Sequence, residues 1–574
     1  MKISEQDRYF FRSPLLEQFI NIGKTPQKIT DFQLTKYWPD VLGERIPSNP
    51  KPDYYQPKSW SVGGDRKWMW CIFWAKSLST NMSIEYHFQI RKNDPLLRKR
   101  IEIRNASNNP VRILDIDIED LSINDKTKHG GYGFPAMLGN QAFCAIEHPA
   151  GVNIAENNRL NLRHHPGKII EPRRTLTSKD AIFYVTPQNK ALTGFHEYLR
   201  KNGRRKNKHL TIYDPCGMSG GYINQHDPLY HISEDNVKES LEHIDRLKKH
   251  NITFDYYFLD VGWQDHSSDL TWFKKDNFPN GGNHIASLLK KRNINFGLWF
   301  SVNYAPWSCG EYPPVKKCIG GTGTGYRGQD RICLDAEPYP DILKKAILHH
   351  IKETGIKGLK MDMSYYYCNE IHHGHLPGKY STESQMDRMI DIAQTATRTC
   401  PDLLIMWYSG TYSPFWLLYG DTIQDKGLHG EAAEVAKQPS PKYRSSVIAN
   451  LDQATKYAEF LPLICQDTLG TWMGNMIMWN KVGKMGWKDA WLMDMARGNL
   501  MSQPWADLRV LSEKDIQFLS WWQNYLKENW ELFLNTKHIL GSPWSEKPYG
   551  YVSSKNNHAI CTIFNPSFLI NEIN

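Results

Sequence analysis

Short apolar segments alternate with amphipathic segments from about residue 208 to residue 510, and this alternation limits the fold more than any other feature. It is typical of parallel strands joined by right-handed helical crossovers. About eight such units in about 300 residues predict a (β/α)8 barrel rather than an open sheet. The expected helices lie near residues 234–250, 284–292, 338–354 and 381–399. The expected strands occupy residues 209–215, 254–260, 294–300, 356–362, 402–408, 421–424, 460–464 and 500–504.

Regions with strand character flank the predicted barrel. The first 195 or so residues alternate apolar and polar positions between turns, as in an antiparallel β-sandwich. A Trp-rich helix and further strands follow residue 510. We therefore predict a sandwich over residues 1–200, a catalytic barrel over 201–510, and a helix with a short β element over 511–574.

The composition is that of a folded chain, with 40% hydrophobic residues, 23% charged residues and a net charge of +9. No apolar run is long enough for a membrane span, and no nucleic-acid motif accompanies the short basic clusters. The ten cysteines form no CxxC pair, so we expect no zinc ribbon and no cofactor. The protein is expected to be cytoplasmic, or periplasmic or secreted if a signal peptide was removed. A homo-oligomer is left open.

The carboxyl ends of barrel strands carry the reactive side chains, so the ends of the predicted strands indicate the site. Carboxylates, a lysine and aromatic rings converge there. Two carboxyls acting on an anomeric carbon, with flat aromatic faces for the ring, are typical of glycoside chemistry. The side chains at these ends are Asp260, Trp263, Trp299, Trp307, Lys360, Asp362, Trp407, Tyr408, Asp421 and Asp425.

Lys360 and Asp362 are two positions apart on one strand, so both point to the same side of it. The positive charge of Lys360 would keep Asp362 ionised, and an ionised carboxylate of fixed direction suits a nucleophile. The alternative is a buried ion pair inside the barrel. The position of both residues at the strand end favours the catalytic interpretation.

Four segments resemble the melibiase-like clan, the α-galactosidase group of glycoside hydrolase families 36 and 27. They are LDVGWQ (259–264), GLWF (297–300), GLKMD (358–362) and the stretch from Trp407 to Tyr419. The resemblance implies a retaining α-glycosidase with a covalent intermediate, with Asp362 as nucleophile and Lys360 on sugar hydroxyls. Asp260 and Trp263 match the clan's substrate-binding motif, but Val261 replaces its second aspartate. A modified or different sugar is therefore a second expectation beside galactose.

The resemblance implies an acid/base about 60 residues after the nucleophile. Asp425 is the first candidate, and Asp421 and Glu431 are alternatives that would otherwise contact substrate. In a retaining enzyme the two carboxyls lie about 5–5.5 Å apart.

A histidine-rich segment, residues 370–375, follows the nucleophile strand. It is interpreted as a substrate-contacting loop through His375, with an inert polar loop and a metal site as alternatives. The clan needs no metal, so none is predicted.

The sequence thus predicts a retaining, exo-acting α-glycosidase that removes galactose or a related sugar from an oligosaccharide or polysaccharide. The alternatives are a hydrolase of the same clan with another sugar specificity, a non-catalytic carbohydrate-binding relative, and a metal-dependent barrel enzyme. No nucleic-acid or membrane partner is expected.

Overall fold

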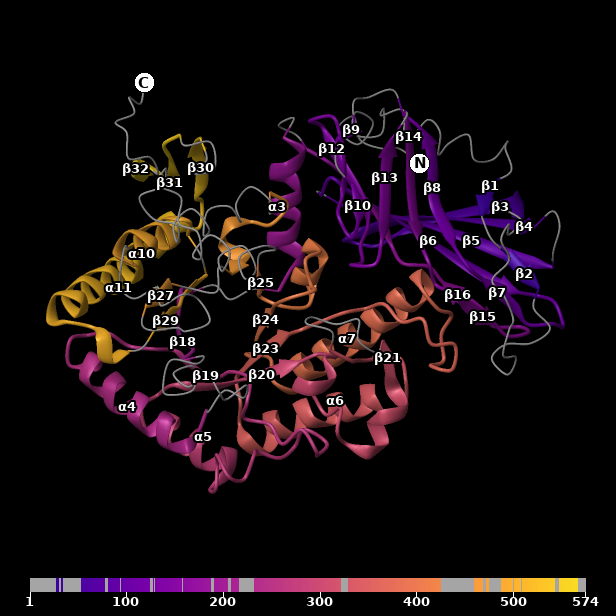
Figure 1. Cartoon of the computed structure of the whole chain (residues 1–574). Helices are drawn as coiled ribbons and strands as arrows, with labels where there is room; N and C mark the ends of the chain where they lie inside the picture. Colours follow the sequence, from indigo (N-terminus) through magenta and orange to yellow (C-terminus); the bar gives the residue numbers. More distant parts are fainter. Residues whose placement is uncertain are drawn as a thin grey trace.

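A computed structural model gives the fold of the chain (Figure 1). The residues that the structure describes are 27–29, 32–34, 53–77, 81–92, 94–123, 127–128, 130–156, 158–186, 190–204, 208–215, 232–321, 329–424, 459–467, 471–473, 487–498, 500–506, 508–541 and 547–565.

Eight parallel strands form a nearly closed barrel, which confirms the predicted fold class. The first, β18, pairs with the second strand on one side and with the eighth on the other. In barrel order the strands are β18 (Leu210–Tyr213), β19 (Tyr256–Leu259), β20 (Asn295–Ser301), β23 (Gly358–Asp362), β24 (Leu404–Trp407), β25 (Thr422–Gln424), β26 (Gln466–Asp467) and β28 (Met501–Ser502).

Helices cover the barrel, and the first four of them are amphipathic, each with a buried apolar face. Ser233 caps the first of them by accepting a hydrogen bond from the Asn236 N–H. The helices are α4 (Glu234–Lys248), α5 (Gly281–Lys290), α6 (Tyr339–His349), α7 (Lys379–Thr399) and α10 (Trp487–Ala496).

The seventh strand is shorter and lies later than predicted. The apolar segment 460–464 ends in a 3-10 turn, Leu463–Cys465, and β26 begins only at Gln466. A parallel pair, β27 (Thr471–Met473) and β29 (Pro504–Ala506), continues strands seven and eight. Strands seven and eight are thus each divided into two short pieces.

The N-terminal region is an antiparallel sandwich, as predicted. Alternate residues of β5 are buried, as expected of a sheet with one face in a core. The larger sheet contains β1 (Gln27–Ile29), β3 (Asp53–Gly64), β4 (Trp68–Ser77), β5 (Met82–Arg91), β6 (Leu96–Asn105), β9 (Thr127–Lys128), β11 (Ala136–Leu138), β12 (Ala142–Ile146), β16 (Thr175–Thr177) and β17 (Ala181–Val185). A smaller sheet shares its core and contains β8 (Ile116–Ser122), β10 (Gly131–Tyr132), β13 (Val152–Glu156) and β14 (Arg159–His164). A third sheet contains β2 (Phe32–Leu34), β7 (Val111–Ile113) and β15 (Lys168–Ile170).

Helix α3 (Ala191–Asn202) follows the sandwich strands and leads to the barrel. After the barrel come α11 (Glu513–Phe533) and three antiparallel strands, which match the helix and β element expected there. Ser512 and Asp515 form a capping box at the start of α11. The strands are β30 (Lys537–Leu540), β31 (Tyr549–Lys555) and β32 (His558–Phe564).

Buried charged groups join the sandwich to barrel helix α7. The Glu383 carboxylate lies 2.9 Å from His164 Nδ1, and Asp387 contacts His148 and Lys179. Burial alone would raise the pKa of Glu383, but His164 and neighbouring cations hold this pKa at about 2. The sandwich therefore supplies counter-charges for carboxylates of the barrel.

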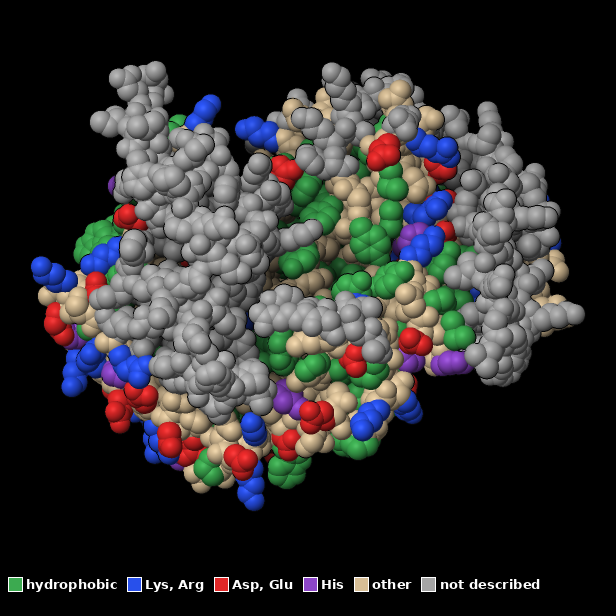
Figure 2. Space-filling model, in the orientation of Figure 1, with side chains coloured by type: hydrophobic (Ala, Val, Ile, Leu, Met, Phe, Trp, Pro, Cys, Tyr) green, Lys and Arg blue, Asp and Glu red, His purple; other side chains and the backbone are tan. Residues whose placement is uncertain are grey.

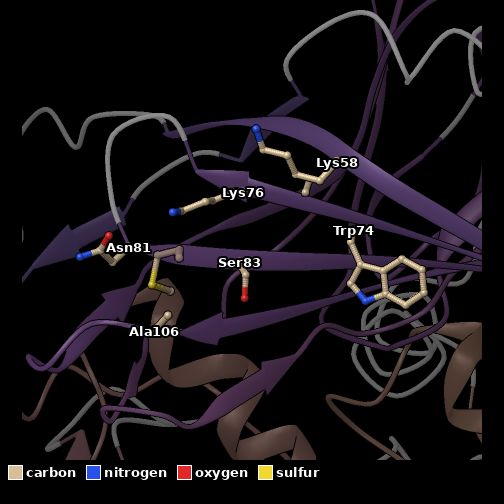
Figure 3. Close-up of a pocket in the computed structure, with 8 residues that line it drawn as sticks. Lys58, Trp74, Lys76, Asn81, Ser83 and Ala106 are labelled. Atoms are coloured by element: carbon tan, nitrogen blue, oxygen red, sulfur yellow. The ribbon is translucent and has the colours of Figure 1, made fainter.

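The surface mixes charges of both signs over α4 and α5 (Figure 2). A pocket lies on the larger sandwich sheet, where Lys58, Trp74, Lys76 and Ser83 line it (Figure 3). No residue of the predicted site lines this pocket. Among the described residues, no helix is both long enough and apolar enough to cross a membrane.

Candidate active site

Strand pairing determines which side chains face the inside of the barrel. Trp299 of β20 pairs with Lys360 of β23, and Lys360 pairs with Met406 of β24. Because side chains alternate along a strand, Lys360 and Asp362 share the inner face. The strand pairings can be followed in the same way from strand to strand around the barrel. Each strand then has one or two inward-facing residues at its carboxyl end. The polar members of this group, named here the lumen group, are Asp214, Asp260, Lys360, Asp362, Tyr408, Gln424, Asp467 and Gln503.

Lys360 lies between two carboxylates of the lumen group. Its ammonium donates to Asp214 Oδ2 at 2.6 Å and to Asp260 Oδ2 at 2.5 Å. All three side chains are buried. Burial and the negative charge of Asp260 raise the pKa of Asp214 to about 7, although Lys360 opposes this. Burial acts to raise the pKa of Asp260 as well, but Lys360 and the Val261 N–H outweigh it and lower that pKa.

The raised pKa of Asp214 predicts a pH-dependent contribution to stability. The folded chain binds this proton more tightly than the unfolded chain, so the contribution is complete below about pH 4 and is lost as the pH rises towards 7. The Asp214→Asn variant cannot lose this proton. We expect its free energy of unfolding, relative to the wild type, to increase between pH 4 and pH 7. Denaturation at several pH values measures this, with Asp391→Asn on the surface of α7 as a control. A difference that does not change with pH would contradict the prediction.

Asp362 is held by three N–H donors. Its Oδ1 accepts from the Met363 N–H at 2.6 Å and the Ser409 N–H at 3.1 Å, and its Oδ2 accepts from Trp299 Nε1 at 3.1 Å. Lys360 is not among the donors to Asp362 in the described part of the chain, so the expected direct pairing of Lys360 with Asp362 is replaced by these N–H groups. Met363 has a φ of +53°, a strained value for a methionine. These fixed donors determine the direction of the Asp362 carboxylate.

Tyr408 and Asp467 complete the opposite wall of the barrel mouth. The Tyr408 hydroxyl donates to Asp467 Oδ2 at 2.6 Å, and Lys360 Nζ lies 4.7 Å from the centre of the tyrosine ring. Both side chains are buried. Burial and the Asp467 charge raise the pKa of Tyr408, so its hydroxyl stays protonated.

Buried amides lie beside these charged groups. Neither Gln503 nor Gln264 has a hydrogen-bond partner for its side-chain oxygen or nitrogen within the described ranges. The Gln424 Nε2 also lacks one there. Gln424 and Gln503 belong to the lumen group, so their unpaired atoms can bond polar groups of a ligand.

The sequence analysis missed Asp214, Gln424, Asp467 and Gln503. Asp214 lies near the end of the predicted strand 209–215 and directly follows β18, so reading the end of that strand would have found it. Asp467 ends a strand of two residues, too short for a sequence pattern to locate. Gln503 follows an equally short strand.

Two predicted site residues lie away from the lumen group. Trp263 is enclosed among Phe273, Phe300 and His350, and its indole N–H donates to the Trp299 carbonyl. Neither ring face is open for stacking. Asp421 precedes β25, at the amino end of the barrel, and accepts from the Ile405 N–H at 2.8 Å. It also contacts Arg204 at 3.3 Å, so its carboxylate has a structural role.

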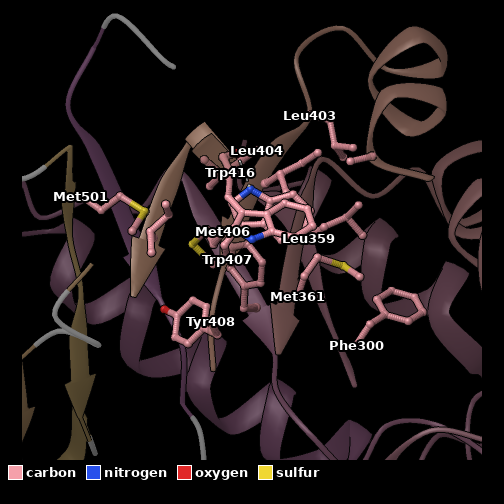
Figure 4. Close-up of a cluster of buried hydrophobic side chains, with 14 of the residues drawn as sticks. Phe300, Leu359, Met361, Leu403, Leu404, Met406, Trp407, Tyr408, Trp416 and Met501 are labelled. Carbon is pink, nitrogen blue, oxygen red and sulfur yellow. Dashed lines mark hydrogen bonds between the residues drawn. The ribbon is translucent and has the colours of Figure 1, made fainter. Parts of the chain in front are cut away.

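Three further predicted site residues, Trp407, Trp307 and His375, also lie outside the lumen group. Trp407 packs against Trp416 and donates its indole N–H to the Trp416 carbonyl, within the cluster of buried side chains in Figure 4. Trp307 is half-buried on the loop after β20, beside Tyr304. His375 lies beside a cysteine thiol rather than beside Asp362. Asp425 and Glu431 lie outside the described residues.

The comparisons with known proteins agree with the barrel fold. Residues 219–420 match the sequence model described as the glycosyl hydrolases family 31 TIM-barrel domain. No curated protein matches the chain. Among solved structures, the GH36 α-galactosidase AgaA from Geobacillus stearothermophilus in complex with raffinose is similar over 98% of this chain and 88% of its own. The TM-score is 0.65 and the identity 12%. An α-galactosidase from Lactobacillus brevis is similar over 94% and 84%, with a TM-score of 0.63 and 12% identity.

The barrel is thus of the type found in glycoside hydrolases. The sequence match is to family 31, whereas the AgaA structure is described as family 36. The sequence resemblance to families 36 and 27 therefore holds at the level of the fold, and the particular family stays open.

Proposed function

We propose that the protein is a retaining, exo-acting α-glycosidase that acts on terminal galactose or a related sugar. The observation that carries this proposal is Asp362, whose two oxygens are directed by three N–H donors at the carboxyl end of the fourth barrel strand. The similarity to α-galactosidase structures supports the choice of substrate class.

Asp362 attacks the anomeric carbon while an acid protonates the leaving oxygen, and the glycosidic bond breaks as the ester forms. The same acid, now a base, takes a proton from water. This water attacks the anomeric carbon and releases Asp362. Two inversions leave the configuration of the sugar unchanged. Asp425 directly follows β25, the sixth strand, and is our candidate for the acid/base.

The lumen group supplies hydroxyl partners for one sugar ring. The Asp214 and Asp260 carboxylates accept hydrogen bonds, and Lys360 donates them. The amides of Gln424 and Gln503 can do both. Such a mixture of donors and acceptors suits a polyhydroxylated ring better than a charged or apolar ligand. Val261 is buried and offers no hydroxyl partner, which keeps a deoxy or anhydro sugar within the proposal.

A panel of aryl α-glycosides tests the proposal, with the matching β-glycosides as controls. We expect hydrolysis of at least one α-glycoside of galactose or a related sugar, with the α-anomer of the free sugar appearing first by NMR. Raffinose and oligosaccharides with modified sugars extend the panel. Release of the β-anomer would contradict the retaining mechanism. Binding of sugars without hydrolysis of any substrate would indicate a non-catalytic relative.

A further inference from the structure

Four side chains that commonly bind metal ions gather beside the barrel mouth. They are Cys333, Cys368, His373 and His375, and all are buried. One ligand atom of each lies within 4.8 Å of all the others. Cys333 Sγ lies 3.1 Å from His375 Nε2, and Cys368 Sγ lies 3.4 Å from His373 Nδ1.

We propose that these four residues bind one structural Zn²⁺ ion in a tetrahedral Cys2His2 site. Zinc bonds of about 2.0–2.3 Å require ligand atoms roughly 3.3–3.8 Å apart. The distances between ligand atoms in the cluster lie on both sides of this range, so shifts of about 1 Å or less would complete the site. Two soft sulfurs and two imidazoles favour zinc over calcium or magnesium, which prefer oxygen ligands. Four protein ligands leave no open position, as in structural rather than catalytic zinc sites.

The outer hydrogen bonds orient both histidines for metal binding. His373 Nε2 lies 3.0 Å from the Lys317 carbonyl, and His375 Nδ1 lies 2.9 Å from the Leu376 carbonyl. A carbonyl can only accept, so these ring nitrogens carry the protons. The other nitrogen of each ring then directs its lone pair towards the thiols. Metal-bound histidines usually have such a carbonyl partner.

The backbone around the cluster supports the same assignment. The Asp335 N–H donates to Cys333 Sγ and the Glu370 N–H to Cys368 Sγ, each at 3.4 Å. Such bonds stabilise thiolates. A Cβ at position 320 would lie 2.6 Å from Cys368 Sγ, so Gly320 leaves the thiols the space that any other residue would fill.

The site would join the two loops that border the nucleophile. Cys333 follows β22 (Arg331–Ile332), on the loop between β20 and α6, where β22 pairs with β21 (Ile319–Gly321). The other three ligands lie on the loop between β23 and α7. Asn303 and Tyr365 join the same two loops next to Asp362 and Trp299. Zinc would therefore hold the rim of the mouth in place without taking part in the reaction.

Elemental analysis of the full chain, purified without chelator, tests the proposal. We expect about one zinc per chain in the wild type, and a loss of at least about tenfold in Cys333→Ser and His373→Ala. Matched controls are His372→Ala, the exposed neighbour of His373, and Cys144→Ser, a buried thiol of the sandwich. Both controls should keep the zinc. Cobalt in place of zinc should give the visible spectrum of a tetrahedral cobalt thiolate.

A measurement on the wild type alone covers the case in which a variant fails to fold. Removing zinc with a chelator should lower the melting temperature, and added zinc should restore it. Two additional thiols should react with a thiol reagent once the metal is removed. Less than about 0.1 zinc per chain after growth with added zinc, or a disulfide between Cys333 and Cys368, would overturn the proposal. Neither result depends on glycosidase activity, so this test is independent of the proposed function.

Discussion

Replacing Asp362 by Asn is expected to reduce the turnover of an aryl α-glycoside by at least about 10⁴-fold. The amide has nearly the shape of the carboxylate but cannot attack the anomeric carbon. Its oxygen can accept from the Met363 and Ser409 N–H groups, as Asp362 Oδ1 does. Its NH2 group then faces the Trp299 N–H, donor against donor. The variant therefore loses the nucleophile while most of the local structure stays intact.

Steady-state kinetics with one reactive aryl glycoside measures the loss. The control is Asp391→Asn, which removes a surface carboxylate that bonds Lys344 on the outside of the barrel. It should keep near-normal activity. In Asp362→Gly, azide should restore turnover and give a glycosyl azide of β configuration, because azide attacks from the face that Asp362 leaves. If Asp362→Asn kept a tenth of the activity, Asp362 would not be the nucleophile.

Replacing Lys360 by Met is expected to lower the free energy of unfolding at pH 7 by about 3–5 kcal/mol. Methionine fills a similar volume but leaves Asp214 and Asp260 buried without their common cation. One or both must then take up a proton or remain charged in a place that water does not reach, and either outcome costs free energy.

Chemical denaturation at pH 7 and pH 5 measures this effect. The loss should be smaller at pH 5, where the carboxyls bind protons more readily. It should also be smaller in Lys360→Met combined with Asp214→Asn, which has one carboxylate fewer. Lys344→Met removes an exposed ion pair and should change stability by less than about 1 kcal/mol. Equal losses in the two lysine variants would show that the buried contacts of Lys360 contribute little.

The sequence predicts the barrel well because its signals are local. Each of the first five strands is a short and mostly apolar segment, and the helices between them have clear amphipathic spacing. The site is harder to predict from the sequence, because the direction of a side chain depends on the pairing register of its strand. Trp407 and Tyr408 are neighbours in the sequence, yet Tyr408 faces Lys360 and Trp407 faces Trp416. Closeness to a strand end did not distinguish them.

Contacts between distant segments could not be predicted at all. Lys360 was expected to act on Asp362, two positions away, but it bonds Asp214 and Asp260, which other strands supply. The cluster around His375 includes Cys333, which belongs to a different loop. A single sequence contains no signal for such a pairing. No metal was expected because the clan that the sequence resembles needs none, and the sequence alone does not place Cys333 beside these histidines.

The contact between the sandwich and helix α7 has a consequence for how the chain can be divided. Glu383 and Asp387 are carboxylates of a barrel helix, and their partners His148, His164 and Lys179 belong to the sandwich. A barrel produced without residues 1–200 would expose an acidic strip on α7, the helix that follows β23. Deleting the sandwich would thus leave carboxylates of a covering helix of the barrel without their partners. We expect the stability of the barrel to depend on the sandwich, so the two parts should be kept together when the gene is shortened, fused or recombined.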